Sequence, residues 1–243
     1  MAKTIVITGA GLGLGRALAR RFAKEGDTLI LLGRTLSKVQ ELADELGAPH
    51  FAVECDVGSA DSVRAAFATI AARHATIDVL INNAAIYEPF MVENATDEQI
   101  MGSIATNLAG PIYTCRAAIP MMEKGAHIIN VTSESVALEF PMLSLYQCTK
   151  AGLERFTQSL FKELHPKGIR VTVARAGPMY EEGKASGWPQ DIAMQFMQLC
   201  MAAGIDMRTR PISHVNNVTD VFRALLDLPG DVAVPHVSIE GWR

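Results

Sequence analysis

Short apolar runs alternate with longer segments of helical periodicity along most of the chain. Several runs, such as IVI, LILL and VLI, are continuously apolar, which is typical of strands covered on both faces in a parallel sheet. Strands are expected at residues 4–8, 28–32, 50–54, 79–81, 127–131, 170–174 and near 232–239. Helices are expected at residues 13–25, 37–46, 60–73, 98–123, 145–164, 191–203 and 219–226.

This alternation predicts an α/β fold, a single Rossmann-type doubly wound sheet of about seven mostly parallel strands with helices on both faces. No shift in composition marks a domain boundary, so residues 1–243 are expected to form one domain. An insertion at about 176–216, in which no strand is predicted, interrupts the pattern. Long loops of this kind are often functional, and we expect this one to contact substrate.

The composition argues against several classes of function. The chain has 243 residues, 49% hydrophobic and 20% charged, and its net charge of −4 gives no basic surface for nucleic acid. No apolar stretch approaches the ~18 residues of a membrane span, and the N-terminal segment lacks a signal-peptide pattern. The four cysteines are widely separated and the six histidines lack ligand spacing, so we expect neither disulfides nor a metal site. A cytoplasmic location is therefore expected.

A glycine-rich segment, TGAGLGLG, follows the first predicted strand and opens the first helix. Glycines permit a tight turn there, and the free amides of the helix N-terminus favour a pyrophosphate. The run alone is also compatible with a plain turn, but its place between a strand and a helix favours dinucleotide binding. The contacts expected in this segment are Gly9, Gly11, Leu12, Gly13 and Leu14.

The end of the second predicted strand bears on the choice of dinucleotide. An acidic residue there would bind the ribose hydroxyls of NAD, but the sequence has Gly33 followed by Arg34. A guanidinium without a neighbouring carboxylate suits a 2′-phosphate, so NADP(H) is favoured over NAD(H). The alternative is that Arg34 only lies on a surface turn.

Tyr146 and Lys150 stand four residues apart in YQCTK, 13 residues after Ser133. On a helix this spacing places both side chains on one face, where the ammonium can stabilise the phenolate and lower the pKa of Tyr146. Either residue alone is more often structural. Together with the glycine-rich segment, the pair predicts a proton donor beside a hydride cofactor, and thus an enzyme.

These segments resemble, in order and spacing, the motifs of the short-chain dehydrogenase/reductase (SDR) family over essentially the whole chain. The matching positions are Thr8, Gly9, Gly13 and Gly15 of TGxxxGxG, the pair Asp56-Val57, the run Asn82-Asn83-Ala84-Ala85, Asn107, Ser133, and Tyr146 with Lys150. The resemblance implies a catalytic tetrad of Asn107, Ser133, Tyr146 and Lys150. It also implies cofactor contacts at Asp56, Val57, Asn83, Ala84, Tyr146, Lys150, Gly177 and Met179.

The resemblance assigns a role to each member of the tetrad. Tyr146 is expected to donate the proton to the carbonyl oxygen, and Ser133 to hold that oxygen. Lys150 is expected to bind the nicotinamide ribose as well, while Asn107 positions a water that links the lysine to solvent.

Three positions depart from the family pattern. Ala85 stands where a glycine is usual, Ala176 where a proline is usual, and Glu181 where a threonine is usual. These departures bear on how the nicotinamide is anchored. The final residues, SIEGWR, also replace a frequent VDGG ending, which bears on the C-terminal interface.

Substrate is expected beyond the carboxyl ends of the strands. The predicted pocket residues are Ser135, Tyr87, Tyr180 and Trp188. Their surroundings are apolar and contain methionines, which suits a bulky hydrophobic carbonyl compound. The nearby acidic side chains are expected to face solvent, with selection of a cationic or hydroxylated substrate as the alternative; they are Glu134, Glu139, Glu181 and Glu182. The apolar helix at 191–203 is either a substrate lid or a helix packed in the core or an interface.

We therefore expect an NADP(H)-dependent oxidoreductase of the carbonyl reductase or alcohol dehydrogenase type, acting on a small molecule. The resemblance implies a homodimer or homotetramer, and no nucleic acid, membrane or metal is expected to take part. Two alternatives remain: reduction of C=N or C=C bonds on the same scaffold, and a non-catalytic protein that senses NADP(H). Relatives of those kinds often change the Tyr, Ser or Lys, all of which are retained here.

Overall fold

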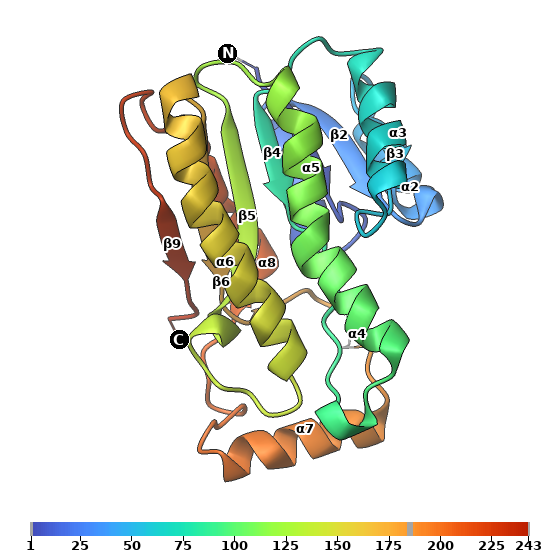
Figure 1. The fold of residues 1–243 in the computed structure, drawn as a ribbon, viewed down its shortest axis with the longest axis vertical. Helices are drawn as coiled ribbons and strands as arrows, with labels where there is room; N and C mark the ends of the chain where they lie inside the picture. The colour runs from blue at the N-terminus through green and yellow to red at the C-terminus, as the bar shows by residue number, and fades with distance from the viewer. Residues whose placement is uncertain (1, 184–186, 243) are drawn as a thin grey trace.

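The protein is described here by a computed structural model covering residues 2–183 and 187–242. The main strands are β1 (Thr4–Thr8), β2 (Thr28–Gly33), β3 (Phe51–Glu54), β4 (Val79–Asn82), β5 (His127–Ser133), β6 (Arg170–Ala176) and β9 (His236–Ile239). They form one parallel sheet in the order β3-β2-β1-β4-β5-β6-β9 (Figure 1). The predicted Rossmann-type sheet of seven strands is therefore confirmed.

Helices cover both faces of the sheet. They are α1 (Gly13–Lys24), α2 (Leu36–Leu46), α3 (Ala60–Ala71), α4 (Asp97–Ile104), α5 (Gly110–Ala118), α6 (Ser144–Leu164), α7 (Gln190–Ala202) and α8 (Val215–Asp227). Successive strand residues point to opposite faces, so Ile5 and Ile7 pack with α1, α2 and α8, whereas Val6 packs with α3, α5 and α6. Burial on both faces explains why β1, β2 and β4 consist of continuous apolar runs.

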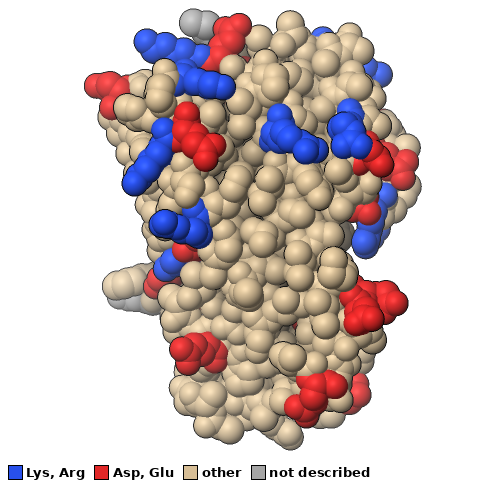
Figure 2. All heavy atoms as spheres, viewed as in Figure 1, with Lys and Arg blue, Asp and Glu red and all other residues tan. Residues whose placement is uncertain are grey.

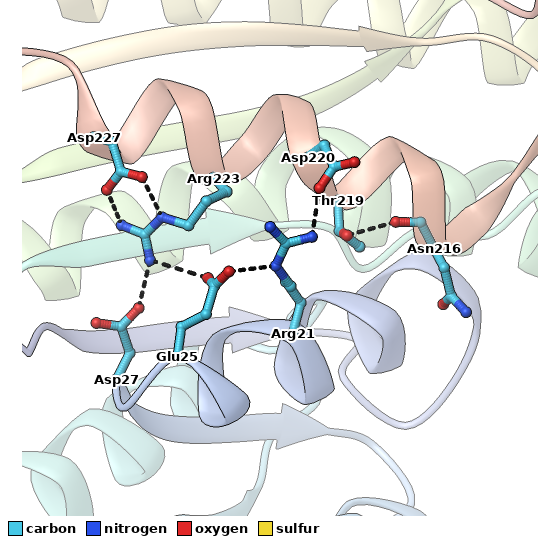
Figure 3. A network of polar contacts seen from close by, with 8 residues as sticks. All are labelled: Arg21, Glu25, Asp27, Asn216, Thr219, Asp220, Arg223 and Asp227. Atoms are coloured by element: carbon cyan, nitrogen blue, oxygen red, sulfur yellow. Dashed lines mark hydrogen bonds and ion pairs between the residues drawn. The ribbon is translucent and has the colours of Figure 1, made fainter.

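Ion pairs join α1 to α8, as Figure 3 shows. Arg223 of α8 donates to Asp27 at 2.8 Å and to Asp227 at 2.6 and 2.9 Å. Arg21 of α1 also contacts Asp220 of α8. Asp27 directly precedes β2, so this network lies at the amino ends of the strands.

The helix expected at residues 98–123 is interrupted, and that expectation was wrong. Between α4 and α5 lies a π-helical turn (Ala105–Ala109), and a 3-10 turn (Ile119–Met121) follows α5. Pro111 supplies the physical reason. It has no N–H to bond the carbonyl of Asn107, and in a regular helix its ring would crowd that carbonyl.

The segment at about 176–216 contains two short strands, although the sequence predicts none. β7 (Met179–Tyr180) pairs with β8 (Ser213–His214) in parallel. Two residues in each strand are too few for an alternating pattern to be recognised. The rest of the segment contains α7, which lies across the ends of α4 and α6 in Figure 1. Residues 184–186 lie outside the part that the structure describes.

Candidate active site

The strand order reverses beside β1, because the chain adds β2 and β3 on one side of β1 and β4 on the other. Beyond the carboxyl ends of these strands lies a cavity of about 400 Å³. Ligands of open α/β sheets bind at this kind of switch point. Predicted cofactor residues line it: Gly9, Gly11, Leu12, Gly13, Leu14, Arg34, Asp56, Val57, Asn83 and Ala84.

Glycines make one wall of this cavity because side chains do not fit there. Gly9 has a φ of +66°, and a Cβ on it would lie 2.8 Å from the Cα of Ala84. A Cβ on Gly15 would lie 2.4 Å from the carbonyl oxygen of Gly9. The glycine loop thus packs directly on the segment after β4 and leaves a backbone-lined space at the start of α1. This cradle fits the pyrophosphate of a dinucleotide.

Thr8 fixes the segment that faces the glycine loop. Its Oγ1 accepts hydrogen bonds from the amides of Asn83 at 3.0 Å and Ala84 at 3.1 Å. The Asn83 side chain in turn donates to the carbonyl oxygens of Thr8 and Gly9. Thr8 belongs to the glycine motif, but the motif alone does not reveal this role in the site.

The other end of the cavity bears on cofactor choice. Exposed Arg34 lines it together with Thr35 and Lys38. A Cβ on Gly33 would lie 2.7 Å from a methyl of Val39, so an acidic side chain does not fit there unless Val39 moves. This end therefore carries two positively charged side chains, and a carboxylate at position 33 would have to displace Val39.

A second cavity of about 380 Å³ adjoins the first and shares Leu14, Asn83 and Ala85 with it. It lies at the end of β5 and the start of α6. Predicted residues that line it are Ser133, Ser135, Tyr146, Lys150, Tyr87, Gly177 and Met179. The structure thus brings three members of the expected tetrad to one cavity beside the glycine-lined space.

Burial acts on Tyr146 and Lys150 in opposite directions. The Lys150 ammonium donates to the carbonyl oxygen of Val131 at 2.9 Å, and burial lowers the pKa of Lys150 to about 8. Burial raises the pKa of Tyr146 to about 12, against the lowering effect of a hydrogen bond from Ser133. Both shifts favour the neutral forms. Without a bound cofactor, the phenol of Tyr146 is therefore a weaker acid than that of a free tyrosine.

Asn107, the fourth member of the expected tetrad, does not line either of the two cavities. Its Oδ1 accepts from the amide of Ile86 at 2.7 Å, and its Nδ2 donates to the carbonyl of Ile86 at 2.9 Å. Nδ2 also lies 3.3 Å from Oγ1 of Thr149, on α6 beside Lys150. The side chain therefore fixes the segment after β4 against α6, while the π-helical turn changes the hydrogen bonding of the backbone around it.

The predicted substrate residues separate into two groups. Tyr87 packs edge-on against Tyr146 with ring centroids 4.9 Å apart, and the Trp188 ring lies 5.0 Å from that of Tyr87. Ser135 is buried, and its Oγ has no hydrogen-bond partner among the described residues. Tyr180 lies apart: it is 45% exposed, packs on His214, and lines none of the cavities described here.

Glu134 does not face solvent freely, so that expectation was wrong. Only 17% of its side chain is exposed, and it pairs with Arg210. Arg210 is 76 residues away in the sequence and belongs to no motif, so no sequence pattern indicates this pairing. The expected exposure holds for Glu139 and Glu182.

The three departures from the family pattern occupy different surroundings. Ala85 lines both cavities. Ala176 is buried and pairs with Ser133 of β5 and Ile239 of β9. Glu181 lies near Arg20 of α1 and helps to raise the pKa of that guanidinium.

Two further features concern the residues that the structure describes. None of their helices is long and apolar enough to cross a membrane. No group of three or more His, Cys, Asp or Glu side chains among them is arranged to hold a metal ion.

Comparison with known proteins gives consistent results. A sequence model described as short chain dehydrogenase matches residues 3–190. Carbonyl reductase family member 4 of Danio rerio is 30% identical over 230 residues, which cover 94% of this chain and 91% of that protein. The NADP-dependent 3-hydroxy acid dehydrogenase YdfG of Escherichia coli (strain K12) is 34% identical over 178 residues, 71% of each chain.

Another relative is much longer than this chain. The uncharacterized short-chain type dehydrogenase/reductase y4vI of Sinorhizobium fredii is 38% identical over 191 residues, which make up 76% of this chain but only 35% of that protein. Among solved structures, the alcohol dehydrogenase of Thermococcus sibiricus, complexed with 5-hydroxy-NADP, has a TM-score of 0.82 and 25% identity. The match covers 99% of this chain and 97% of that one.

Proposed function

Because the chain belongs to the short-chain dehydrogenase family, we propose that this oxidoreductase uses NADP(H) to interconvert a carbonyl and an alcohol. The observation that carries the proposal is that Ser133, Tyr146 and Lys150 line one cavity, directly beside the glycine-lined one. A hydride donor in the first cavity and a proton donor in the second would face the same carbonyl group.

The tetrad residues would act on the carbonyl oxygen. A dinucleotide bound in the first cavity would supply the hydride in reduction and accept it in oxidation. Tyr146 donates its phenol proton to the oxygen in reduction and takes it back in oxidation, while Ser133 donates a hydrogen bond to the same oxygen. The Lys150 ammonium stabilises the phenolate. Asn107 holds the segment after β4 against α6 through its hydrogen bonds to Ile86 and Thr149.

Three observations support NADP(H) as the cofactor. Arg34 and Lys38 line the end of the first cavity, and position 33 is a glycine, without the carboxylate that would bind ribose hydroxyls. The relative YdfG is NADP-dependent by its name. The archaeal structure was solved with 5-hydroxy-NADP.

The apolar lining of the second cavity favours an apolar carbonyl compound as substrate. Tyr87, Phe140, Leu143, Met179 and Met207 line it, and Trp188 backs Tyr87. We propose that the segment at about 176–216 acts as a substrate loop, because its residues 176–179 and 207 reach the cavity. In α7, Phe196 and Cys200 are buried against Phe140 and Leu143, so the helix packs behind the cavity.

We also propose that the chain forms a homodimer or homotetramer, as is typical of its family. In Figure 1, α5 and α6 lie in the middle of the face toward the viewer. Figure 2 shows that the middle of this face carries few charged side chains. A face of this kind suits contact with a second copy.

The proposal is tested by following NADPH absorbance with ketones, aldehydes, quinones, imines and activated enones. We expect carbonyl turnover that falls at least ~100-fold in Tyr146→Phe, which lacks the proton donor. NADPH binding should be unchanged. Tyr113→Phe on α5 is the matched control and should keep the wild-type rate.

Other outcomes would favour the alternatives. Turnover of imines or enones alone would indicate C=N or C=C reduction. Tight NADPH binding without any turnover would indicate a sensing role. Carbonyl turnover that persists in Tyr146→Phe would refute the role of the tyrosine.

A further inference from the structure

Glu134 places a carboxylate inside the substrate cavity without a task in the proposed reaction. Among the described residues that line this cavity, Glu134 and Lys150 alone carry charged side chains. Lys150 belongs to the tetrad. Glu134 directly follows Ser133, so its charge lies close to the carbonyl that the tetrad would hold.

Arg210 neutralises this carboxylate. Its Nη2 lies 2.5 Å from Oε2 of Glu134, and its guanidinium lies 5.2 Å from the centre of the Phe140 ring. The two charged side chains are only 20% and 17% exposed. An ion pair shielded from water to this degree is not a freely solvated surface pair, and loss of one partner leaves an uncompensated charge.

The pair also joins two parts of the cavity wall. Glu134 follows the catalytic strand β5, whereas Arg210 belongs to the loop between α7 and β8. A Cβ on Gly177 would lie 3.7 Å from Oε2 of Glu134, so the carboxylate sits against the first turn after β6. The ion pair therefore lies where the substrate loop meets the catalytic strand.

We propose that the Glu134–Arg210 ion pair makes the cavity select uncharged carbonyl substrates, because Arg210 pairs with the carboxylate that, among the described residues, lines this cavity. This inference rests on the proposed function, whose substrate class it narrows. Glu134 and Arg210 are specificity-determining residues here; neither takes part in proton or hydride transfer.

The charged and titratable groups around Glu134 predict how the substrate preference should depend on pH. Arg210 faces it from the loop, Glu240 from the segment after β9, Tyr146 from α6 and Tyr87 from the segment after β4. Burial and Glu240 raise the pKa of Glu134, whereas Arg210 lowers it. Without Arg210 the carboxylate would take up a proton at higher pH than in the wild type. Any new preference for cations should therefore weaken as the pH is lowered.

The test compares three benzaldehydes that carry a methyl, a trimethylammonio or a carboxylate group at the same ring position. Wild-type protein with NADPH should reduce the methyl compound with the highest kcat/KM. In Arg210→Met the ratio of cationic to neutral kcat/KM should rise at least ~10-fold, because Glu134 becomes unpaired in a partly dry site. In the double variant Glu134→Gln/Arg210→Met the ratio should return close to the wild-type value.

These variants separate an effect of the Glu134 charge on substrate preference from a structural effect of Arg210 on the loop. Arg208→Met, on the same loop and exposed, is the matched control and should leave the ratio unchanged. If Arg210→Met lowers all three rates equally and the double variant stays as slow, the pair only holds the loop and the proposal is overturned. A pH-independent ratio in Arg210→Met would also contradict it.

Binding separates this proposal from the proposed function. Dissociation constants for the corresponding neutral and cationic benzamides, measured by calorimetry, need no turnover. A ratio that shifts in Arg210→Met and reverts in the double variant, in a protein that reduces no carbonyl, would support the charge selection and refute the reductase. Turnover with an unshifted ratio would refute the charge selection alone. If no aldehyde is reduced and no benzamide binds, both proposals are overturned.

Discussion

The Nζ atom of Lys150 lies 5.8 Å from the centre of the Tyr146 ring while it donates to the carbonyl of Val131 on the neighbouring strand. Strand β5 thus fixes the lysine that stands one helical turn after the tyrosine. Burial favours a neutral lysine and a protonated tyrosine in this state of the chain. The positive charge of an oxidised nicotinamide nearby would oppose the rise in the pKa of Tyr146.

Buried Lys150 should make stability depend on pH. Its pKa in the folded chain is about 8, against an ordinary value of 10.5. Between these values the unfolded chain binds more protons at this site, so this site makes the free energy of unfolding rise with pH by up to about 3 kcal/mol. Below pH 8 the full cost of a buried charge remains. Lys150→Met should remove this dependence.

The measurement is urea unfolding of the cofactor-free protein at about pH 7 and about pH 10. Lys150→Met should gain the most stability relative to wild type at the lower pH. Exposed Lys167→Met is the control and should run parallel to wild type. If the Lys150→Met curve also runs parallel, the ammonium is not buried as the structure indicates.

Arg34 should decide between the two dinucleotides. Arg34→Asp replaces a guanidinium at the end of the first cavity, where we propose that the 2′-phosphate binds, with a carboxylate that would repel the phosphate and could bind ribose hydroxyls. We expect the ratio of kcat/KM for NADPH to that for NADH to fall by about 10- to 100-fold, as loss of a charge-assisted hydrogen bond predicts. Arg64→Asp, on α3, is the matched control. An unchanged ratio in Arg34→Asp would refute the 2′-phosphate contact.

Gly15 should be needed for cofactor binding although a helix position ordinarily prefers alanine. The Cβ of Gly15→Ala would lie 2.4 Å from the Gly9 carbonyl and 2.7 Å from Nδ2 of Asn83, so the glycine loop must shift. We expect NADPH affinity to fall at least ~10-fold, because the shifted loop amides would no longer be oriented to donate hydrogen bonds to the pyrophosphate. Gly102→Ala on α4, where the nearest atom is 3.9 Å away, should bind normally. Equal affinities would show that the loop tolerates the shift.

The sequence could predict the features that depend on local patterns. Continuous apolar runs placed the central strands β1, β2 and β4, because both faces of these strands are buried. The YxxxK spacing placed Tyr146 and Lys150 on one helix face because a helix repeats every 3.6 residues. The interruption at Asn107 was also readable, since Pro111 cannot supply the hydrogen bond that a regular helix needs.

The rest depended on contacts between distant parts of the chain. The pairing of Glu134 with Arg210 joins residues 76 positions apart, and neither residue belongs to a periodic pattern. The strands β7 and β8 are too short for alternation, so only their pairing reveals them. Tyr180 illustrates the opposite case: an aromatic residue in the expected loop faces His214 instead of the cavity.

Arg223 should contribute far more stability than Arg21, although both belong to the same ion-pair network (Figure 3). Asp27, a partner of Arg223, has only 5% of its side chain exposed, whereas Asp220, a partner of Arg21, has 67% exposed. Arg223→Met leaves a buried carboxylate without its guanidinium, which predicts a loss of about 2–4 kcal/mol in the free energy of unfolding. Arg21→Met should cost about 0–1 kcal/mol, as exposed pairs do. Urea unfolding measures both, and equal losses would contradict the role of burial. Because the network lies at the amino ends of the strands, neither variant should change kcat/KM at a temperature where it stays folded.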